Sequence, residues 1–217
     1  GTNEDCQLGF SYGSPIVTKL ENGQWVVLVT SGYNNVNSPA DSAKDGKGYL
    51  YVLNANTGAL LLKLGTGNGS ESTPSGLAQI SAFVEDASIN NVTERVYGTD
   101  LAGNLWRFQF SFTGNVLSGG SSVLIGTAKD NSGVAQPITI KPVLTEYKGE
   151  TMVMFGTGRL LGVSDLDASV STNSQTQSVY AVKDPEPFST TTKYSNLRGS
   201  LAPLSISQTG DNRTIAC

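Results

Sequence analysis

Histidine is absent from this chain of 217 residues. Its absence excludes the Ser-His-Asp and Cys-His forms of nucleophilic catalysis, removes the commonest general base at neutral pH, and excludes most zinc sites. An enzyme with this sequence would have to work through carboxylates, lysine, tyrosine or a cofactor, and paired carboxylates are the hydrolase chemistry that remains. Hydrolase chemistry is therefore not expected of this chain.

Charge is also scarce. Charged residues make up 15% of the chain, the net charge is −4, and no basic run is present. Because phosphate binding depends on clustered lysine and arginine, we expect no nucleic-acid partner. No apolar stretch reaches the ~20 residues of a membrane helix, and the chain does not begin with a charged and then apolar signal segment. We expect no transmembrane segment in this chain, and a mature or excised piece of a larger protein.

The chain contains only two cysteines, Cys6 and Cys217, near its opposite ends. Their spacing matches no zinc or redox motif. They can pair with each other, or each can bond a partner outside this chain. The abundance of glycine, with 25 residues, and of serine, threonine and asparagine is typical of a secreted β protein. We expect an exported protein with a disulfide whose connectivity is open.

An internal repeat organises what is present. A hairpin pattern, with two apolar strands around a short polar turn, occurs at 14–32, 81–100 and 141–158. Each copy is followed by a strand with a central aromatic residue, at 49–54, 104–109 and 178–183. Repeated units of four antiparallel strands are typical of β-propeller blades.

No segment shows a sustained helical period, so we predict an all-β fold. The expected strands are 14–20, 24–31, 49–54, 59–64, 80–86, 94–99, 104–110, 122–126, 138–147, 151–156 and 178–183. The insertions 32–47, 66–79 and 158–177 are long for hairpin loops, and function or disorder would lie there. Closed propellers use at least about four blades. We therefore expect a partial propeller of about three to four blades, one region over 1–217 with a weakly patterned tail at 185–217.

The turn of the second hairpin has the pattern of a calcium loop. Oxygen donors alternate along it: Asp86, Ser88 and Asn90 offer side chains, Val92 its carbonyl, and Glu94 closes the loop. This alternation suits calcium, a hard cation that takes six to eight oxygens. These five residues are the predicted metal ligands.

The residue at the sixth position of this loop is Asn91, where calcium loops usually place a glycine with positive φ. Asparagine tolerates that conformation better than most residues. The alternative is a polar hairpin turn without metal, because Asn-Asn is ordinary turn chemistry.

Other conspicuous residues have structural interpretations. Trp106 and Tyr51 lie on strongly patterned strands and are expected to pack between blades. Arg107 is expected to pair with Asp100 or to point into solvent. Two acids at positions 41 and 45 either form a second cation site or solvate a long turn.

A family resemblance follows from a series of segments taken in order. The segment Gly48-Tyr-Leu-Tyr-Val-Leu-Asn-Ala-Asn-Thr-Gly58 resembles the blade repeat of quinoprotein-like propellers. The more specific segments are Gly65-Thr-Gly-Asn-Gly69, Pro74-Ser-Gly-Leu77, the calcium-like loop, Val96-Tyr-Gly-Thr-Asp-Leu-Ala-Gly-Asn-Leu-Trp-Arg-Phe108, Met154-Phe-Gly-Thr-Gly-Arg159 and Gln177-Ser-Val-Tyr180. With these segments the chain resembles the C-terminal propeller of the PilY/PilC family of type IV pilus proteins, from about residue 12 to 184.

The resemblance implies a non-enzymatic role at the bacterial surface. It implies an exported protein, associated with the outer membrane and the pilus tip, that supports pilus extension against retraction, twitching motility and surface adhesion. The implied cofactor is Ca²⁺, held by the five residues named above. The implied partners are pilins or minor pilins and a host-cell surface receptor.

The loop departs from the family pattern, which carries more aspartate and commonly a glycine at the turn. With fewer carboxylates, we expect a dissociation constant on the order of 10⁻⁴ M or weaker, as in extracellular modules. Two other functional classes remain open. One is a quinone-dependent dehydrogenase propeller, although the cysteines are terminal and the candidate loop lies on a hairpin. The other is a metal-free scaffold propeller that binds proteins or glycans.

Overall fold

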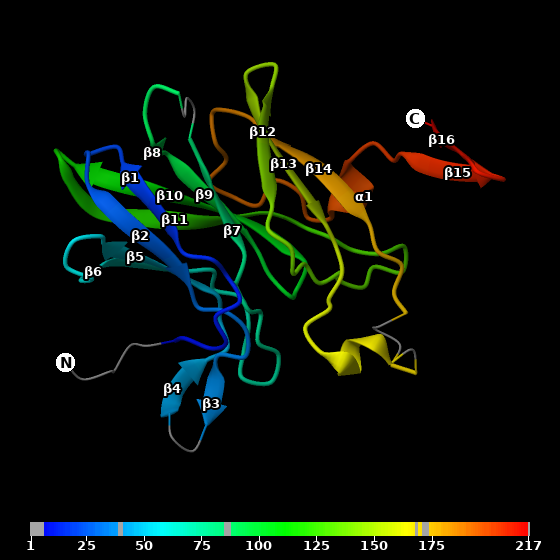
Figure 1. Ribbon diagram of the computed structural model, residues 1–217, viewed down its shortest axis with the longest axis horizontal. Helices are drawn as coiled ribbons and strands as arrows, with labels where there is room; N and C mark the ends of the chain where they lie inside the picture. Colours follow the sequence, from blue (N-terminus) through cyan, green and yellow to red (C-terminus); the bar gives the residue numbers. More distant parts are fainter. Residues whose placement is uncertain (1–6, 39–40, 85–87, 168, 171–173, 217) are drawn as a thin grey trace.

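The computed structural model describes residues 7–38, 41–84, 88–167, 169–170 and 174–216. Strands dominate these residues and form three larger sheets and two short two-stranded ribbons (Figure 1). The expectation of an all-β protein is confirmed. In the ranges just given, no helix is long and apolar enough to cross a membrane.

The first sheet has the strand order β6-β5-β2-β1-β8. Its strands are β1 (Ile16–Leu20), β2 (Trp25–Thr30), β5 (Tyr49–Asn54), β6 (Leu60–Gly65) and β8 (Val92–Thr93). The β1–β2 hairpin turns at Gly23, whose φ of 81° favours glycine. Alternate residues of β2, namely Val26, Leu28 and Thr30, are buried, because side chains of a strand point to opposite faces in turn.

The second sheet has the order β11-β10-β9-β7 and shares one core with the first sheet and another with the third. Its strands are β7 (Ile80–Phe83), β9 (Arg95–Thr99), β10 (Asn104–Thr113) and β11 (Val116–Thr127). Every residue of β9 is buried. Val96 packs into the core shared with the first sheet, whereas its neighbour Tyr97 packs into the core shared with the third. Successive side chains of β9 thus pack the second sheet against the first sheet on one face and against the third sheet on the other.

The third sheet has the order β12-β13-β14. Its strands are β12 (Val143–Tyr147), β13 (Glu150–Gly156) and β14 (Val179–Asp184). All three sheets repeat one plan, a hairpin followed by a third antiparallel strand carrying an aromatic residue. In the first two sheets β6 and β11 add the expected fourth strand.

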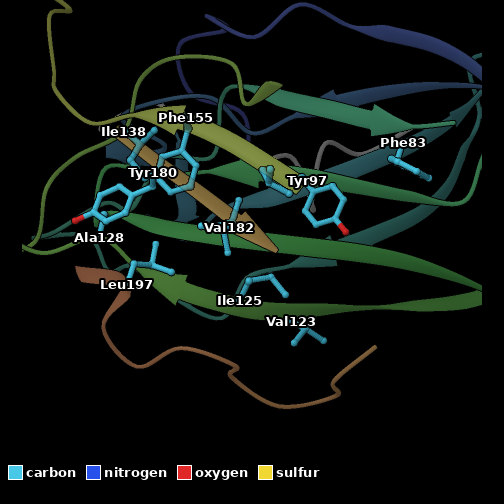
Figure 2. Packing of buried hydrophobic residues seen from close by; sticks show 12 residues of the cluster. Phe83, Tyr97, Val123, Ile125, Ala128, Ile138, Phe155, Tyr180, Val182 and Leu197 are labelled. Carbon is cyan, nitrogen blue, oxygen red and sulfur yellow. The ribbon is translucent and has the colours of Figure 1, made fainter. Parts of the chain in front are cut away.

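The interface between the second and third sheets is a continuous apolar core. It contains Tyr97 from β9, Ile125 from β11, Phe155 from β13 and Val182 from β14 (Figure 2). The rings of Phe155 and Tyr180 lie 5.6 Å apart. Burying such aromatic and branched side chains supplies most of the free energy that holds the sheets together.

Further elements lie outside the three sheets. They are β3 (Val36–Ser38), β4 (Asp41–Asp45), the short 3₁₀ helix η1 (Val163–Leu166), α1 (Leu197–Ser200), β15 (Ser205–Thr209) and β16 (Asn212–Ala216). The insertion at 32–47 thus contains a two-stranded ribbon. Part of the tail is ordered against the core, because Leu197 is fully buried and Tyr194 N donates to Ile125 O at 2.8 Å.

A buried ion pair joins β10 to the end of β14. Arg107 Nη1 lies 2.6 Å from Asp184 Oδ2, and the two side chains are 0% and 1% exposed. Tyr97 donates its hydroxyl proton to Asp184 at 2.8 Å, and Arg107 also donates to the Ser189 carbonyl. The expectation that Arg107 pairs with Asp100 or faces solvent was therefore wrong, because its partner lies 77 residues away.

Asp100 instead organises the turn before β10. Its carboxylate accepts hydrogen bonds from Trp106 Nε1 at 2.8 Å, from the Asn104 backbone and side-chain amides, and from Ala102 N. Burial raises the pKa of the Asp100 carboxyl, and these hydrogen bonds oppose that rise. Trp106 is 6% exposed and Tyr51 is 7% exposed. Trp106 packs in the core shared by the first two sheets, as expected, whereas Tyr51 is buried beside Tyr49 and accepts a hydrogen bond from Gln7 N.

Candidate metal site

The predicted calcium loop is the bend between β7 and β9. These strands pair antiparallel, with Phe83 opposite Arg95. Asp86 lies outside the described residues, as do Cys6 and Cys217. Ser88 and Asn90 are exposed on the bend.

The closing half of the bend is fixed to the first sheet. Val92 and Thr93 form β8, which pairs parallel with Lys19 and Leu20 of β1. Lys19 N and Thr18 Oγ1 both donate to the Asn91 carbonyl, at 3.2 and 3.0 Å. The predicted ligand Val92 therefore lies at the junction of two sheets.

Asn90 shapes the turn that leads into β8. Its Oδ1 accepts a hydrogen bond from Val92 N at 3.0 Å, the Asx-turn pattern in which a side chain replaces a backbone acceptor. Asn91 does not have the positive φ expected at the sixth position, since the described non-glycine residues with positive φ are Asn34 and Lys148. The Asx turn therefore leads directly into the β8 residues that pair with β1.

Glu94, the closing acid, already contacts a cation of the chain. Its Oε2 lies 2.6 Å from Arg95 Nη1, and the Glu94 side chain is 37% exposed. Glu94 N donates to Phe83 O at 3.2 Å, which closes the base of the bend. The Glu94 carboxylate thus lies at the end of the loop, partly exposed to solvent and next to the buried guanidinium of Arg95.

The donor atoms that this bend offers suit calcium. Ser88, Asn90, Val92 and Glu94 contribute a hydroxyl, an amide carbonyl, a backbone carbonyl and a carboxylate, and calcium selects oxygen ligands of mixed charge. The described part of the chain contains no group of three or more His, Cys, Asp or Glu side chains that could hold a metal ion. Any site here therefore depends largely on neutral oxygens.

The second candidate cation site has a structural explanation. Asp45 accepts hydrogen bonds from Lys47 N at 3.0 Å and from the Tyr49 hydroxyl at 2.7 Å, and it lies 3.3 Å from Lys47 Nζ. Although burial acts to raise it, these contacts hold the pKa of the Asp45 carboxyl below its usual range. Asp45 therefore stabilises the turn that leads into β5.

Sequence reasoning missed the surroundings of the closing acid. Arg95 follows Glu94 directly and stacks on the rings of Phe83 and Phe188, with its Cζ 3.9 and 4.5 Å from their centroids. Alternation with Val96 would place a charged residue at 95 on a solvent face, but both faces of β9 are buried. Nothing in the local pattern could have identified Phe188, which lies beyond the end of β14.

Comparison with known proteins gives a consistent result. The family model described as the PilY1 beta-propeller domain matches residues 2–213. The type IV pilus biogenesis factor PilY1 of Pseudomonas aeruginosa is 30% identical over 207 residues, covering 86% of this chain and 16% of the relative. A PilY1 homolog of Xylella fastidiosa is 32% identical over 180 residues, covering 82% of this chain and 13% of the relative.

A solved structure supports the same fold. The crystal structure of the Pseudomonas aeruginosa PilY1 C-terminal domain superposes with a TM-score of 0.70 at 26% identity, over 99% of this chain and 47% of that one. The three repeated sheets are thus propeller blades, as the sequence repeat predicts. The chain spans about half of that domain and roughly a sixth or less of the curated relatives.

Proposed function

The chain belongs to the PilY1 β-propeller domain family, and from this premise we propose that it is a calcium-binding propeller of a type IV pilus assembly and tip protein. The relatives are pilus biogenesis factors, a non-enzymatic family, in agreement with the absence of histidine. The quinone-dependent dehydrogenase is thereby disfavoured. The proposed role is to support pilus extension against retraction, and with it twitching motility and surface adhesion.

The observation that carries the calcium proposal is the position of the oxygen-rich bend. Its closing half pairs with β1 of the neighbouring blade, so an ordered bend fixes two blades relative to one another. Asp86, Ser88, Asn90, the Val92 carbonyl and Glu94 would hold the ion. Bound calcium would neutralise the two carboxylates and favour the ordered form of the bend, which is a local population shift.

The proposed location and partners follow the family. We place the chain outside the cell, at the pilus tip and in association with the outer membrane. Its partners there are pilins or minor pilins and, for adhesion, a host-cell surface receptor. In this proposal, residues 1–217 form one propeller region of a larger protein, with a weakly patterned tail at 185–217.

We expect Asp86→Ala to abolish calcium binding, because it removes one of the two carboxylates among the proposed ligands. Isothermal titration calorimetry with calcium chloride measures binding, and a melting curve without metal checks that the fold is unchanged. In cells that carry the variant, surface pili and twitching motility should decrease.

The matched control is Glu146→Gln, which removes one negative charge from an exposed position on β12. It should leave calcium binding at the wild-type level. Unchanged calcium binding by Asp86→Ala would remove the ligand assignment. If the wild-type chain contains and binds no metal with or without prior chelation, the metal-free scaffold becomes the better description.

A further inference from the structure

The carboxylate of Glu94 has an intramolecular cation partner in Arg95. The pair is close, with 2.6 Å between Oε2 and Nη1, and the Arg95 side chain is only 6% exposed. A buried guanidinium needs a counter-charge, because its desolvation is costly. Glu94 is the acid with which Arg95 makes an ion pair among the described residues.

Arg95 is held from several sides but not fully satisfied. Its Nη2 donates to Thr151 Oγ1 on β13 at 2.5 Å, and its Cζ lies 3.9 Å from the ring centroid of Phe83 and 4.5 Å from that of Phe188. Its Nε is buried and has no hydrogen-bond partner among the described residues. The guanidinium therefore depends strongly on the contacts of its two terminal nitrogens.

These contacts connect the metal loop with the third blade. The ring of Phe188, in the segment after β14, is contacted by Arg95 and also by Arg107, whose Cζ is 4.7 Å from the same ring centroid. Arg107 is in turn paired with Asp184 at the end of β14. A displacement of Arg95 would thus change the contacts of Thr151 on β13 and of the segment 185–190.

There is room for such a displacement. A cavity of about 430 Å³ lies beside the pair and is lined by Glu94, Arg95, Phe110 and Phe188, among others. A calcium ion bound by Glu94 would stand within a few ångströms of the Arg95 charge. At that distance, and with the weak screening near a protein surface, like charges repel strongly.

We propose that Arg95 competes with calcium for the Glu94 carboxylate and so lowers the calcium affinity of the loop. When calcium binds, Arg95 loses its contact with Glu94, and its changed position alters the contacts that it makes with the third blade. The inference rests on the proposed function, since it concerns the regulation of the same loop. The weak calcium affinity that we expect would then have two causes, the competing Arg95 charge and the small number of carboxylates in the loop.

Calorimetric titration of the whole chain with calcium chloride tests the competition. Arg95→Met removes the charge but keeps an unbranched apolar side chain for the two phenylalanine rings, and its dissociation constant should fall about tenfold. Arg95→Lys keeps the charge and should stay within about twofold of wild type. Arg159→Met removes an arginine that pairs with Asp165 outside the loop and should leave the affinity unchanged.

The outcomes separate this inference from the proposed function. An Arg95→Met affinity equal to or weaker than wild type overturns the competition, even if calcium binds. A purely structural role for Arg95 predicts that weaker binding, because the loop would lose a support. If Arg95→Met binds calcium and the wild-type chain does not, the competition is supported and the proposed calcium binding by the wild-type loop is overturned. Absence of binding in every variant overturns both.

Hydrogen exchange on the wild-type chain tests the transmission, and it remains informative if Arg95→Met fails to fold. With calcium, amides of 88–93 should exchange more slowly, and amides of 188–190 should exchange faster, because Phe188 loses a fixed partner. In Arg159→Met the same two changes should occur. Slower exchange in the loop with no change at 188–190 would overturn the transmission.

Discussion

Asp184→Leu is expected to lower the free energy of unfolding by about 3–5 kcal/mol. The change leaves the Arg107 guanidinium, 0% exposed, without its counter-charge, and breaking one side of a buried ion pair is costly by about this amount. It also removes the acceptor of the Tyr97 hydroxyl. Urea denaturation followed by tryptophan fluorescence measures the loss.

The double variant Arg107→Met with Asp184→Leu is the control for this prediction. Replacing both partners of a buried ion pair by apolar side chains is often close to neutral. The double variant should therefore recover more than half of the lost stability. A loss below about 1 kcal/mol in Asp184→Leu alone would contradict the burial of the pair.

Asp100→Ala is expected to destabilise the chain by about 4 kcal/mol. The aspartate accepts hydrogen bonds from Trp106, from Asn104 twice and from Ala102. Removing it leaves the Trp106 donor and both Asn104 donors buried and unpaired, and each such group costs about 1–3 kcal/mol. Thermal unfolding and the fluorescence of Trp106 report the effect.

The matched control for this second prediction is Asp130→Ala. Asp130 also accepts hydrogen bonds in a turn, from Ser132 N, Val134 N and Gln175 Nε2. Its carboxyl lies at the surface, so water can replace the lost acceptor. The loss should be much smaller than for Asp100→Ala, and equal losses would show that burial is not the cause.

Much of the blade plan could be predicted from the sequence, because local patterns define it. The strand at 49–54 was predicted with the bounds of β5, since an apolar run ends at a clear Asn-Thr-Gly turn. In contrast, β11 begins at Val116, six residues before the predicted strand at 122. Its first half contains Gly119 and Gly120, which have little intrinsic preference for strands.

The missed features depend on contacts between distant segments. The strand β8 has two residues and exists because β1 lies beside it. The partner of Arg107 could not be predicted from nearby residues, because the pairing arises only when β10 packs against the end of β14. The candidate site shares this limit: its ligand spacing is local, whereas the Thr151 and Phe188 contacts of Arg95 are not.

The strand β8 has a consequence for how the molecule opens. It lies within the bend of the second blade, yet its ladder partner is β1 of the first. Neither blade can fray at this edge without breaking hydrogen bonds of the other. The first and second blades should therefore unfold locally as one cooperative unit.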